Sequence, residues 1–497
     1  MLLRKRGGSA VLSVSLEENL TRFETDFDGS ADYIERRFRL AGSEAALLTL
    51  EGMVNKQVLA QSVMNPLMDA PLLEEDPVKR FDYLRDCVLS TVDQKEVTDY
   101  SEAVNFLMNG FAIFLLDGCL RALAIGVQGF QFRGVGDPQG EVMQRGSREG
   151  FVEPLQINLS MIRRRLKTPQ LKFEKLILGK ESNTNVCLCY LRGVVSPELL
   201  SRVRNSVKEV DLATVLAAGY VTPFLRKSGN ISLFTTVGLS ERPDTVCGKI
   251  QEGRIALVID GTPNVLIIPH LFIESFQSFD DYAHRPFYTS FIRLLKLLAF
   301  FLSMLLPGFY VATTTFHPEL IPEPLLLKIM QSQSSTPFPI MLEAIVIHII
   351  YEIMREAGLR APKALSHAVS IVGALVIGDT AVSSGLISAP TLMIIALTAI
   401  SSYLVPSFYE STALCRLIFI IVGGTMGFWG LMVGIFLMTA NICSESIYGV
   451  PFSAPVSPFR GRAMRDVFVR ASWKKFSGRE ERVQNMPGST VDQADRL

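Results

Sequence analysis

The stretch LISAPTLMIIALTAISSYLV, residues Leu386–Val405, carries no charged side chain over its whole length. About 20 predominantly apolar residues suffice for a helix to cross the hydrocarbon core of a bilayer, which is about 30 Å thick. Residues 1–285, in contrast, carry charges every few positions. The chain therefore joins a soluble first half to a membrane-embedded second half. Further apolar blocks of the second half are Leu297–Ala312, Phe338–Met354, Ala364–Ile377 and Leu417–Ile442.

This contrast predicts a fold class of α/β plus α-helical membrane structure, with two repeated cytosolic α/β subdomains before a polytopic helical membrane domain. A chain of 497 residues is long enough for two to four domains. The expected divisions are a variable N-terminal segment at 1–30, α/β subdomain 1 at 31–133, a linker and basic helix at 134–168, α/β subdomain 2 at 169–285, the membrane domain at 286–450 and a basic cytoplasmic tail at 451–497.

The soluble half contains an internal repeat. Gly110–Ile125 reads GFAIFLLDGCLRALAI, and Gly253–Ile268 reads GRIALVIDGTPNVLII. Each Asp-Gly lies between two apolar runs of the kind that form strands, which predicts a hairpin at both places. The similarity extends to Leu47–Asn55 with Leu188–Ser196, and to the expected helices Ser101–Met108 and Asp244–Gln251. We therefore expect both subdomains to share one topology.

Composition argues against several classes of function. The formal net charge is zero, with 49 basic and 49 acidic residues, so no general attraction to nucleic acid is expected. The seven cysteines show no metal-ligand spacing, and Cys187 and Cys189 are expected on one face of a strand. No phosphate-binding loop, dinucleotide fingerprint, zinc-protease motif or nucleophile elbow is found. We predict no enzyme activity, no catalytic residues, no cofactor and no metal site.

Basic residues gather at two places. Arg163, Arg164, Arg165 and Lys167 follow a probable helix, where they form either a solvated face or a contact with anionic lipid headgroups. The second group follows the last apolar block and predicts a cytoplasmic tail by the positive-inside rule, the alternative being a solvated tail on either side. Its members are Arg460, Arg462, Arg465, Arg470, Lys474, Lys475, Arg479 and Arg482. The N-terminus lacks a secretory signal, so the soluble half is also expected in the cytoplasm.

Charged residues also lie inside the apolar block at 337–358. Glu343, His348 and Glu352 are candidates for an ion path, because charges at membrane depth normally face protein or water. His348, Glu352, Arg355 and Glu356 share one face of a helix, and Glu343 falls outside that stripe. The alternative is an amphipathic helix that lies flat at the membrane surface.

Small residues at four-residue spacing predict close helix packing. One stripe is Ser366, Ser370, Ala374 and Gly378, and the last apolar block holds two GxxxG pairs, Gly423 with Gly427 and Gly430 with Gly434. The glycines either pack helices or allow a break in a block too long for one pass. Both chain ends inside require an even number of crossings, yet about five blocks are found. One block, either 337–358 or the last, must therefore be re-entrant, interfacial or doubled back.

Several long motifs carry a resemblance to a known family. They are AVSIVGALVIGDTAV (Ala368–Val382), LTAISSYLVPSF (Leu397–Phe408), IYGVPFSAPVSP (Ile447–Pro458), DGTPNVLIIP (Asp260–Pro269), TTFHPELIP (Thr314–Pro322) and RGSREGFVE (Arg145–Glu153). Over roughly residues 30–460 the chain resembles the A subunits of GerA family spore germinant receptors. The related stage V sporulation protein AF has the same architecture, but the VSIVGALVIG stretch is more similar to a receptor A subunit.

The resemblance implies a multi-pass protein of the spore inner membrane that works with a permease-like B subunit and a lipoprotein C subunit. It also implies a homo-oligomer whose membrane part conducts ions once nutrient is sensed. Two other hypotheses stay open at this point: a scaffold subunit beside another conducting chain, and a membrane enzyme. The enzyme is the weakest, because no nucleophile and base can be assembled from the sequence.

Overall fold

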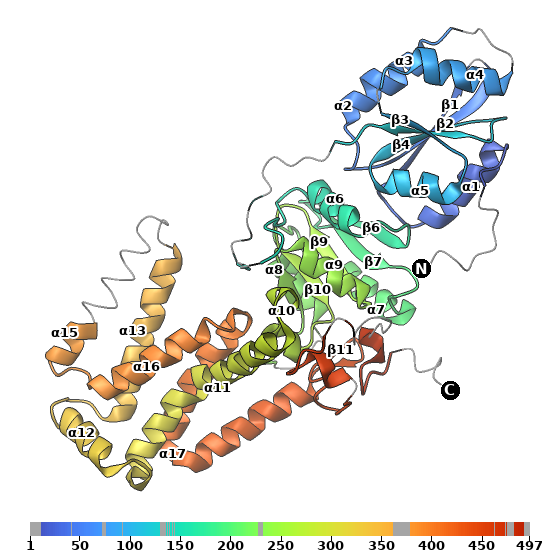
Figure 1. The fold of residues 1–497 in the computed structure, drawn as a ribbon. Helices are drawn as coiled ribbons and strands as arrows, with labels where there is room; N and C mark the ends of the chain where they lie inside the picture. Colours follow the sequence, from blue (N-terminus) through green and yellow to red (C-terminus); the bar gives the residue numbers. More distant parts are fainter. Residues whose placement is uncertain are drawn as a thin grey trace.

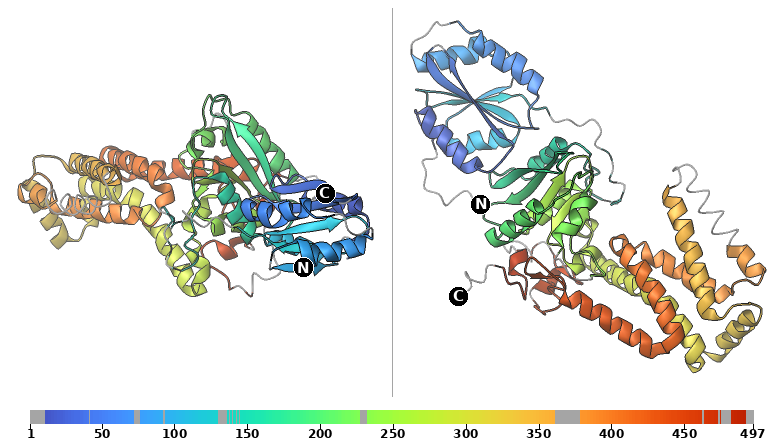
Figure 2. Two further views of the ribbon diagram at one scale, coloured as in Figure 1. Left: turned by 90° about the horizontal axis from the view of Figure 1, so that it is seen from above. Right: turned by 180° about the vertical axis from the view of Figure 1, so that it is seen from behind.

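The computed structural model describes residues 11–491 except 41, 72–75, 92, 130–135, 137, 139, 142, 144, 227–231, 361–377, 462, 473 and 475–481. Three parts follow one another in space as they do in the chain: two α/β subdomains and a helical half (Figures 1 and 2). The second subdomain lies between the first subdomain and the helices.

Subdomain 1 is an antiparallel five-stranded sheet, in the order β1-β2-β4-β5-β3, with helices on both faces (Figure 1). Side chains of β2 alternate, so Ala46 and Leu48 pack under α1 and α5 while Leu47 packs under α2, α3 and α4. Its elements are α1 (Leu16–Phe27), β1 (Tyr33–Leu40), β2 (Ser43–Leu50), α2 (Lys56–Leu59), η2 (Ala60–Met64), α3 (Asn65–Met68), α4 (Pro77–Tyr83), η3 (Leu84–Val88), β3 (Gln94–Val97), α5 (Tyr100–Met108), β4 (Phe111–Leu116) and β5 (Ala122–Gly126).

Subdomain 2 has the same sheet, in the order β6-β7-β9-β10-β8. Cys187 and Cys189 lie buried on one face of β7 under α6 and α9, as predicted, and Leu188 faces α7. Its elements are α6 (Leu155–Arg165), β6 (Leu171–Leu178), β7 (Thr184–Leu191), α7 (Pro197–Lys208), α8 (Ala218–Val221), η4 (Thr222–Leu225), β8 (Gly238–Ser240), α9 (Pro243–Gln251), β9 (Ile255–Ile259), β10 (Val265–Ile268), η5 (Phe272–Phe276) and α10 (Asp280–Ala283).

The predicted repeat is confirmed, down to single hydrogen bonds. Asp117 follows β4, and its Oδ1 accepts the backbone N–H of Leu16, the first residue of α1, at 2.9 Å. Asp260 follows β9, and its Oδ1 accepts the backbone N–H of Leu155, the first residue of α6, at 2.8 Å. The two Asp-Gly hairpins are therefore equivalent. Each copy begins with a helix, α1 or α6, that the sequence-based divisions assign to the N-terminal segment and to the linker.

The helical half holds four of the five predicted apolar blocks within its described residues. Its elements are α11 (Pro286–Phe316), η6 (Pro318–Leu320), α12 (Glu323–Ser334), α13 (Ile340–Arg360), α15 (Gly378–Ser383), α16 (Ala389–Ser402), η8 (Pro406–Phe408) and α17 (Tyr409–Ser444). The block Ala364–Ile377, with Ser366, Ser370 and Ala374, lies outside the described residues. Among the described helices, Pro286–Phe316 and Pro406–Ser444 are long and apolar enough to cross a membrane.

The last block doubles back at Gly427. This residue has φ 60° and ψ −145°, a conformation that interrupts α17. Phe408 stacks on Phe272 of subdomain 2 where α17 begins, and Phe428 stacks on His317 at the far end of α11. The second leg returns toward subdomain 2 (Figure 1). At about 1.5 Å per residue, each leg is about 26 Å long, close to the thickness of a bilayer core.

The chain after α17 packs onto subdomain 2. A short ladder joins β11 (Ser446–Ile447) to β12 (Val450–Pro451), and the 3-10 turns η9 (Ala463–Asp466) and η10 (Val483–Asn485) follow. Ile447, Val450 and Val483 belong to the same core as the side chains of α7. The described part of the predicted basic tail is therefore a folded segment.

Candidate functional site

Two of the three predicted ion-path residues, His348 and Glu352, lie close to an arginine inside the helical half. His348 and Glu352 lie one turn apart on α13, and Arg416 comes from the first leg of α17. Glu352 Oε1 lies 3.6 Å from Arg416 Nη1 and 3.9 Å from His348 Nδ1. The site exists because the first leg of α17 places Arg416 against α13. We call Arg416, Glu352 and His348 the buried charge cluster.

Arg416 is completely buried in this cluster. Its Nε donates to the carbonyl oxygen of Ser303 in α11 at 2.7 Å. Its Nη1 and Nη2, like Nδ1 of His348, have no hydrogen-bond partner among the described residues. The guanidinium charge is therefore balanced by Glu352, since an isolated charge in an apolar interior is very costly.

Glu352 connects the buried charge cluster to the outside of the helical half. Its side chain is 29% exposed, and its Oε2 accepts a hydrogen bond of 2.5 Å from the Tyr409 hydroxyl. The Arg355 guanidinium lies over the Tyr409 ring, 3.2 Å from the ring centroid. Of the stripe predicted on α13, His348, Glu352 and Arg355 thus face α17, whereas Glu356 is exposed and pairs with Arg360.

Glu343 lies apart from that cluster, as its place off the stripe predicted. The side chain is completely buried, and its Oε2 accepts hydrogen bonds from Ser388 Oγ at 2.7 Å and Thr391 Oγ1 at 3.0 Å. Both hydroxyls come from the start of α16. The other oxygen, Oε1, has no hydrogen-bond partner among the described residues. Glu343 is therefore enclosed by helices of its own chain.

The predicted packing glycines lie where helices approach closely. A methyl group added at Gly423 would lie 2.4 Å from the carbonyl oxygen of Gly308 in α11. One added at Gly434 would lie 2.6 Å from the Phe419 ring, across the hairpin. Gly427 forms the turn itself. Both interpretations of the glycine-rich block are therefore correct: Gly423 and Gly434 allow close packing, and Gly427 allows the break.

Two other predicted packing residues, Gly430 and Gly378, do not lie at a close contact between two different helices. A methyl group at Gly430 would meet Val422 and Met426 on the opposite leg of the turn. One at Gly378 would make an ordinary contact of 3.6 Å with Leu392. Close approach is therefore a property of the last block more than of the stripe that ends at Gly378.

The predicted basic cluster at 163–167 does not form one solvated face. Arg163 is completely buried and holds Asp32 of subdomain 1 through two hydrogen bonds of 2.8 Å. Arg164 and Arg165 both pair with Glu149. A run of basic residues does not show where each side chain points. At the end of α6, neighbouring arginines point in different directions and bind different carboxylates. Of this cluster, Arg163 joins the two subdomains and Lys167 adds a hydrogen bond to Asn109 of subdomain 1, whereas Arg164 and Arg165 bind the segment that precedes α6.

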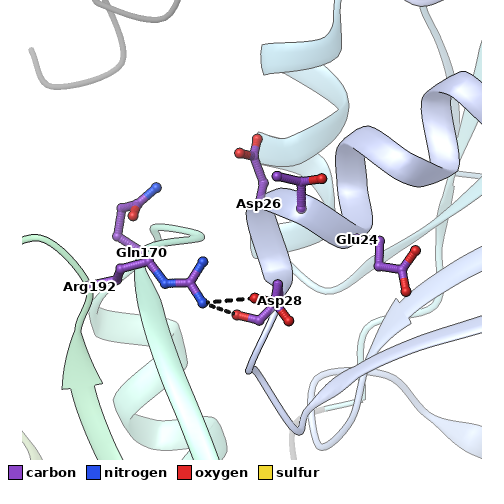
Figure 3. Close-up of a pocket in the computed structure, with 6 residues that line it drawn as sticks. Glu24, Asp26, Asp28, Gln170 and Arg192 are labelled. Atoms are coloured by element: carbon purple, nitrogen blue, oxygen red, sulfur yellow. Dashed lines mark hydrogen bonds and ion pairs between the residues drawn. The ribbon is translucent and has the colours of Figure 1, made fainter. Parts of the chain in front are cut away.

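A cleft of about 420 Å³ lies beside this junction. Figure 3 shows Asp28, directly after α1, against Arg192 of subdomain 2, and Glu24 and Asp26 also line this cleft. Arg192 donates to the Asp28 carbonyl oxygen at 2.7 Å, so its charge is already engaged. The excess of carboxylates suits a cationic or zwitterionic small molecule better than an anion.

Sequence reasoning missed Arg416, Ser388 and Tyr409. Arg416 directly precedes the apolar run that begins at Leu417, and a single charge at the edge of such a run is the signal that could have found it. The hydroxyls of Ser388 and Tyr409 carry no comparable signal. Within the described residues no group of three or more His, Cys, Asp or Glu side chains could hold a metal ion.

Comparisons with known proteins cover nearly the whole chain. The family model described as Bacillus/Clostridium GerA spore germination protein matches residues 21–482. Spore germination protein KA of Bacillus subtilis (strain 168) is 37% identical over 478 residues, which are 95% of this chain and 87% of that protein. Stage V sporulation protein AF of the same strain is 26% identical over 446 residues, 89% of each chain. The crystal structure of the N-terminal domain of the A subunit of the Bacillus megaterium spore germinant receptor GerK3 covers 54% of this chain and 99% of its own, with 28% identity and a TM-score of 0.41.

Proposed function

The chain belongs to the GerA family of spore germination proteins, and from this we propose that it is the A subunit of a nutrient germinant receptor in the spore inner membrane. The match over residues 21–482 carries the proposal, because it includes both α/β subdomains and the helical half. In this proposal identical subunits form an oligomer whose helical halves enclose a nutrient-gated path for ions. A permease-like B subunit and a lipoprotein C subunit complete the receptor. Neither an enzyme activity nor a nucleic-acid partner is part of this role.

In the proposed placement, α11 and both legs of α17 cross the membrane, the chain between α11 and α17 crosses back again, and the α/β subdomains lie in the cytoplasm. The segment after α17 packs on subdomain 2, so both must lie on one side of any membrane that the helices cross. The basic residues of that segment favour the cytoplasmic side. α11 and α17 both begin at subdomain 2, and their far ends meet at His317 and Phe428.

Cysteine labelling tests this placement. In a chain with Cys87→Ser and Cys443→Ser, the exposed residues Ile177 and Leu320 are each replaced by cysteine. An impermeant thiol reagent added outside should label position 320 in intact vesicles and position 177 only after permeabilisation. Labelling of position 177 from outside would refute the cytoplasmic placement of the subdomains.

The ion path is tested with Glu343→Gln and Glu352→Gln, which keep the shape of the side chain and remove its charge. Charges at membrane depth and their burial support a role in the path or in its gate. The matched control is Glu356→Gln, on the same helix but exposed and paired with Arg360. Nutrient-triggered cation release from vesicles that hold the assembled receptor should change in at least one of the first two variants. Unchanged release with normal assembly in both would show that α13 does not take part.

An accessory or scaffold role, as in stage V sporulation protein AF, is the second candidate. The lower identity to that protein, 26% against 37% for germination protein KA, favours the receptor subunit. Ion flux through the purified chain in liposomes separates the two functions. A chain that assembles with its partners but gives no flux in any combination would be a scaffold.

A further inference from the structure

Glu343 lies in a group of oxygen atoms where three helices meet. The carboxylate comes from α13, one hydroxyl from Ser388 directly before α16, and a second from Thr391 in the first turn of that helix. The Tyr310 hydroxyl of α11 lies 3.5 Å from Thr391 Oγ1. The three helices pack against one another in the helical half (Figure 1). We call Glu343, Ser388, Thr391 and Tyr310 the oxygen site.

The surroundings of the oxygen site are apolar. Ala344 of α13 belongs to a buried cluster with Val311 of α11. Ile347, one turn after Glu343, belongs to a second cluster with Ile387 and Ile395. A charge in such surroundings is poorly solvated and needs a partner of opposite charge close to it.

The Glu343 carboxylate has no cationic side chain beside it among the residues that the structure describes. The ion pairs of α13 in this part of the chain involve Glu352 and Glu356 instead. The hydroxyls of Ser388 and Thr391 are neutral, and the N-terminus of a helix such as α16 carries only about half an elementary charge. Glu343 Oε1 is also buried without a hydrogen-bond partner among the described residues. A full negative charge at this place therefore requires a further positive partner.

The hydrogen bonds of the oxygen site lead to the same conclusion. Ser388 Oγ lies 2.7 Å and Thr391 Oγ1 lies 3.0 Å from Glu343 Oε2, and the two hydroxyl oxygens lie 2.8 Å from each other. All three contacts are as short as hydrogen bonds, and each needs a proton between its two oxygen atoms. The two hydroxyls supply two protons. One contact therefore lacks a proton as long as the carboxylate is ionised.

We propose that the oxygen site binds one small monovalent cation, which is either an alkali-metal ion or a proton carried by Glu343. Carboxylate and hydroxyl oxygens replace the hydration shell of an alkali-metal ion, and a proton supplies the missing hydrogen bond. A divalent cation does not fit, because a single carboxylate would leave a net positive charge buried. The inference rests on the proposed function, since it places a cation on the helix assigned there to the ion path.

The oxygen site belongs to a different class from the metal sites considered above. It contains one carboxylate and three hydroxyls, whereas those sites combine three or more His, Cys, Asp or Glu side chains, which the described residues do not bring together. Buried carboxylates at membrane depth commonly mark ion and proton pathways.

Thermal unfolding of the purified full chain in detergent tests the site without nutrient. Lithium, sodium and potassium chloride are each compared with N-methylglucamine chloride at equal ionic strength, because this bulky organic cation does not fit a buried site. An alkali-metal ion that binds only the folded state should raise Tm by about 1–3 °C for each tenfold rise in its concentration. Glu343→Gln should lose that rise, and the control Glu356→Gln, on the same helix but exposed, should keep it.

A pH series in N-methylglucamine chloride alone distinguishes the proton. If the folded state holds a proton on Glu343 that the unfolded chain releases, the Tm of the unaltered chain should fall relative to that of Glu343→Gln as the pH rises. A response to alkali-metal ions identifies the metal ion, and a response to pH alone identifies the proton. Identical responses of the unaltered chain and Glu343→Gln in all of these media would overturn the proposal.

The hydroxyls provide a second test, which leaves the carboxylate in place. Thr391→Val keeps the shape of the side chain, removes one oxygen and should shift the response to the cation to roughly tenfold higher concentration. Thr398→Val is the matched control, because Thr398 is equally buried on α16 and its hydroxyl donates to the Ile394 carbonyl oxygen of its own helix at 2.7 Å. Equal cation responses in the two valine variants would contradict the oxygen site.

None of these measurements uses a nutrient or an ion flux. Loss of the oxygen site as a proposal would therefore leave the receptor assignment standing. A chain that binds the cation but gives no flux in any combination would keep the site and lose the proposed ion path.

Discussion

Removing Glu352 and removing Arg416 should affect the stability of the helical half to different extents. Arg416 is completely buried, and Glu352 is the carboxylate within ion-pair distance of it among the described residues. Glu352 is partly exposed and also accepts from the Tyr409 hydroxyl. Loss of the carboxylate leaves a buried cation without its counter-charge, whereas loss of the cation leaves a partly exposed carboxylate that keeps its hydrogen bond from Tyr409.

Glu352→Gln should therefore destabilise the helical half more than Arg416→Met does, by roughly 1–3 kcal/mol. The double variant Glu352→Gln/Arg416→Met should be close to Arg416→Met alone. Thermal unfolding of the purified protein in detergent measures all three. Equal losses in the two single variants would mean that Glu352 does not balance the guanidinium charge.

His270 is a second residue with an unusual environment, in subdomain 2 between β10 and η5. Burial lowers its pKa to about 4, with Lys249 and Arg254 adding to the effect and Glu274 opposing it. The Glu274 carboxylate is also buried, but Arg254 and Lys249 beside it lower its pKa to about 2. Near neutral pH the group thus holds a neutral imidazole beside an ionised carboxylate.

The unfolding free energy should fall as the pH drops from about 6.5 to about 4. In this range the unfolded state binds a proton on His270 and the folded state does not, so acid favours unfolding by up to roughly 3 kcal/mol. His270→Gln should flatten that slope. His284→Gln, at a half-buried position outside the cluster, is the control and should leave the slope unchanged. Denaturant unfolding at several pH values measures it.

At the scale of secondary-structure elements, α11 and α17 cross with their backbones in contact. A methyl group at Gly308 would lie 2.4 Å from the Phe419 carbonyl oxygen, and one at Gly423 would lie equally close to the Gly308 carbonyl oxygen. Both nearest atoms are backbone atoms, so no side-chain rotation relieves the contact. Small residues allow this approach, which maximises van der Waals contact between helices in lipid.

Gly308→Ala and Gly423→Ala should each cost about 1–3 kcal/mol, because the two helices must move apart. Gly378→Ala is the matched control, since its added methyl group makes only an ordinary contact with Leu392. Thermal unfolding in detergent gives the comparison. A crossing that tolerates alanine at both positions would show that α11 and α17 pack more loosely than described.

At the scale of the whole molecule, a few polar contacts set how the first subdomain sits on the second. The buried Arg163 binds Asp32, and the Lys172 ammonium donates to the Asp26 carbonyl oxygen at 2.5 Å. Burial, with Arg192 and Arg163 nearby, lowers the pKa of Lys172 to about 8. These contacts link residues of the first copy of the repeat to the second and leave the cleft of Figure 3 between them.

Asp32→Asn should loosen the first subdomain from the second, because it leaves the Arg163 guanidinium buried and unbalanced. The expected cost is about 3–5 kcal/mol. Asp28→Asn removes a carboxylate from the exposed pair with Arg192 and should cost no more than about 1 kcal/mol. Hydrogen exchange at the subdomain junction distinguishes the two. Equal protection in both variants would contradict the central role of Arg163.

Local patterns predicted a large part of this architecture. The lengths of the apolar runs separated the soluble half from the helical half, and the paired Asp-Gly motifs predicted two subdomains of one topology. Side chains alternate between the two faces of a strand, and this alternation predicted that Cys187 and Cys189 share one face. Each of these properties depends on residues close together in the chain, so the sequence contains it directly. The family motifs, in order along the chain, likewise indicated the GerA relationship that the comparisons show.

The sites depend on contacts between distant residues. Asp32 and Arg163 lie 131 positions apart, so nothing near Arg163 in the sequence distinguishes it from Arg164. Gly427, and no other glycine of the last block, takes the turn conformation that brings the two legs of α17 together. Whether Glu352 faces lipid, water or a cation follows from where the first leg of α17 places Arg416. The sequence by itself determines which residues are charged and which segments are apolar. Tertiary packing decides which partner a buried charge has, because a buried charge without a partner costs too much free energy.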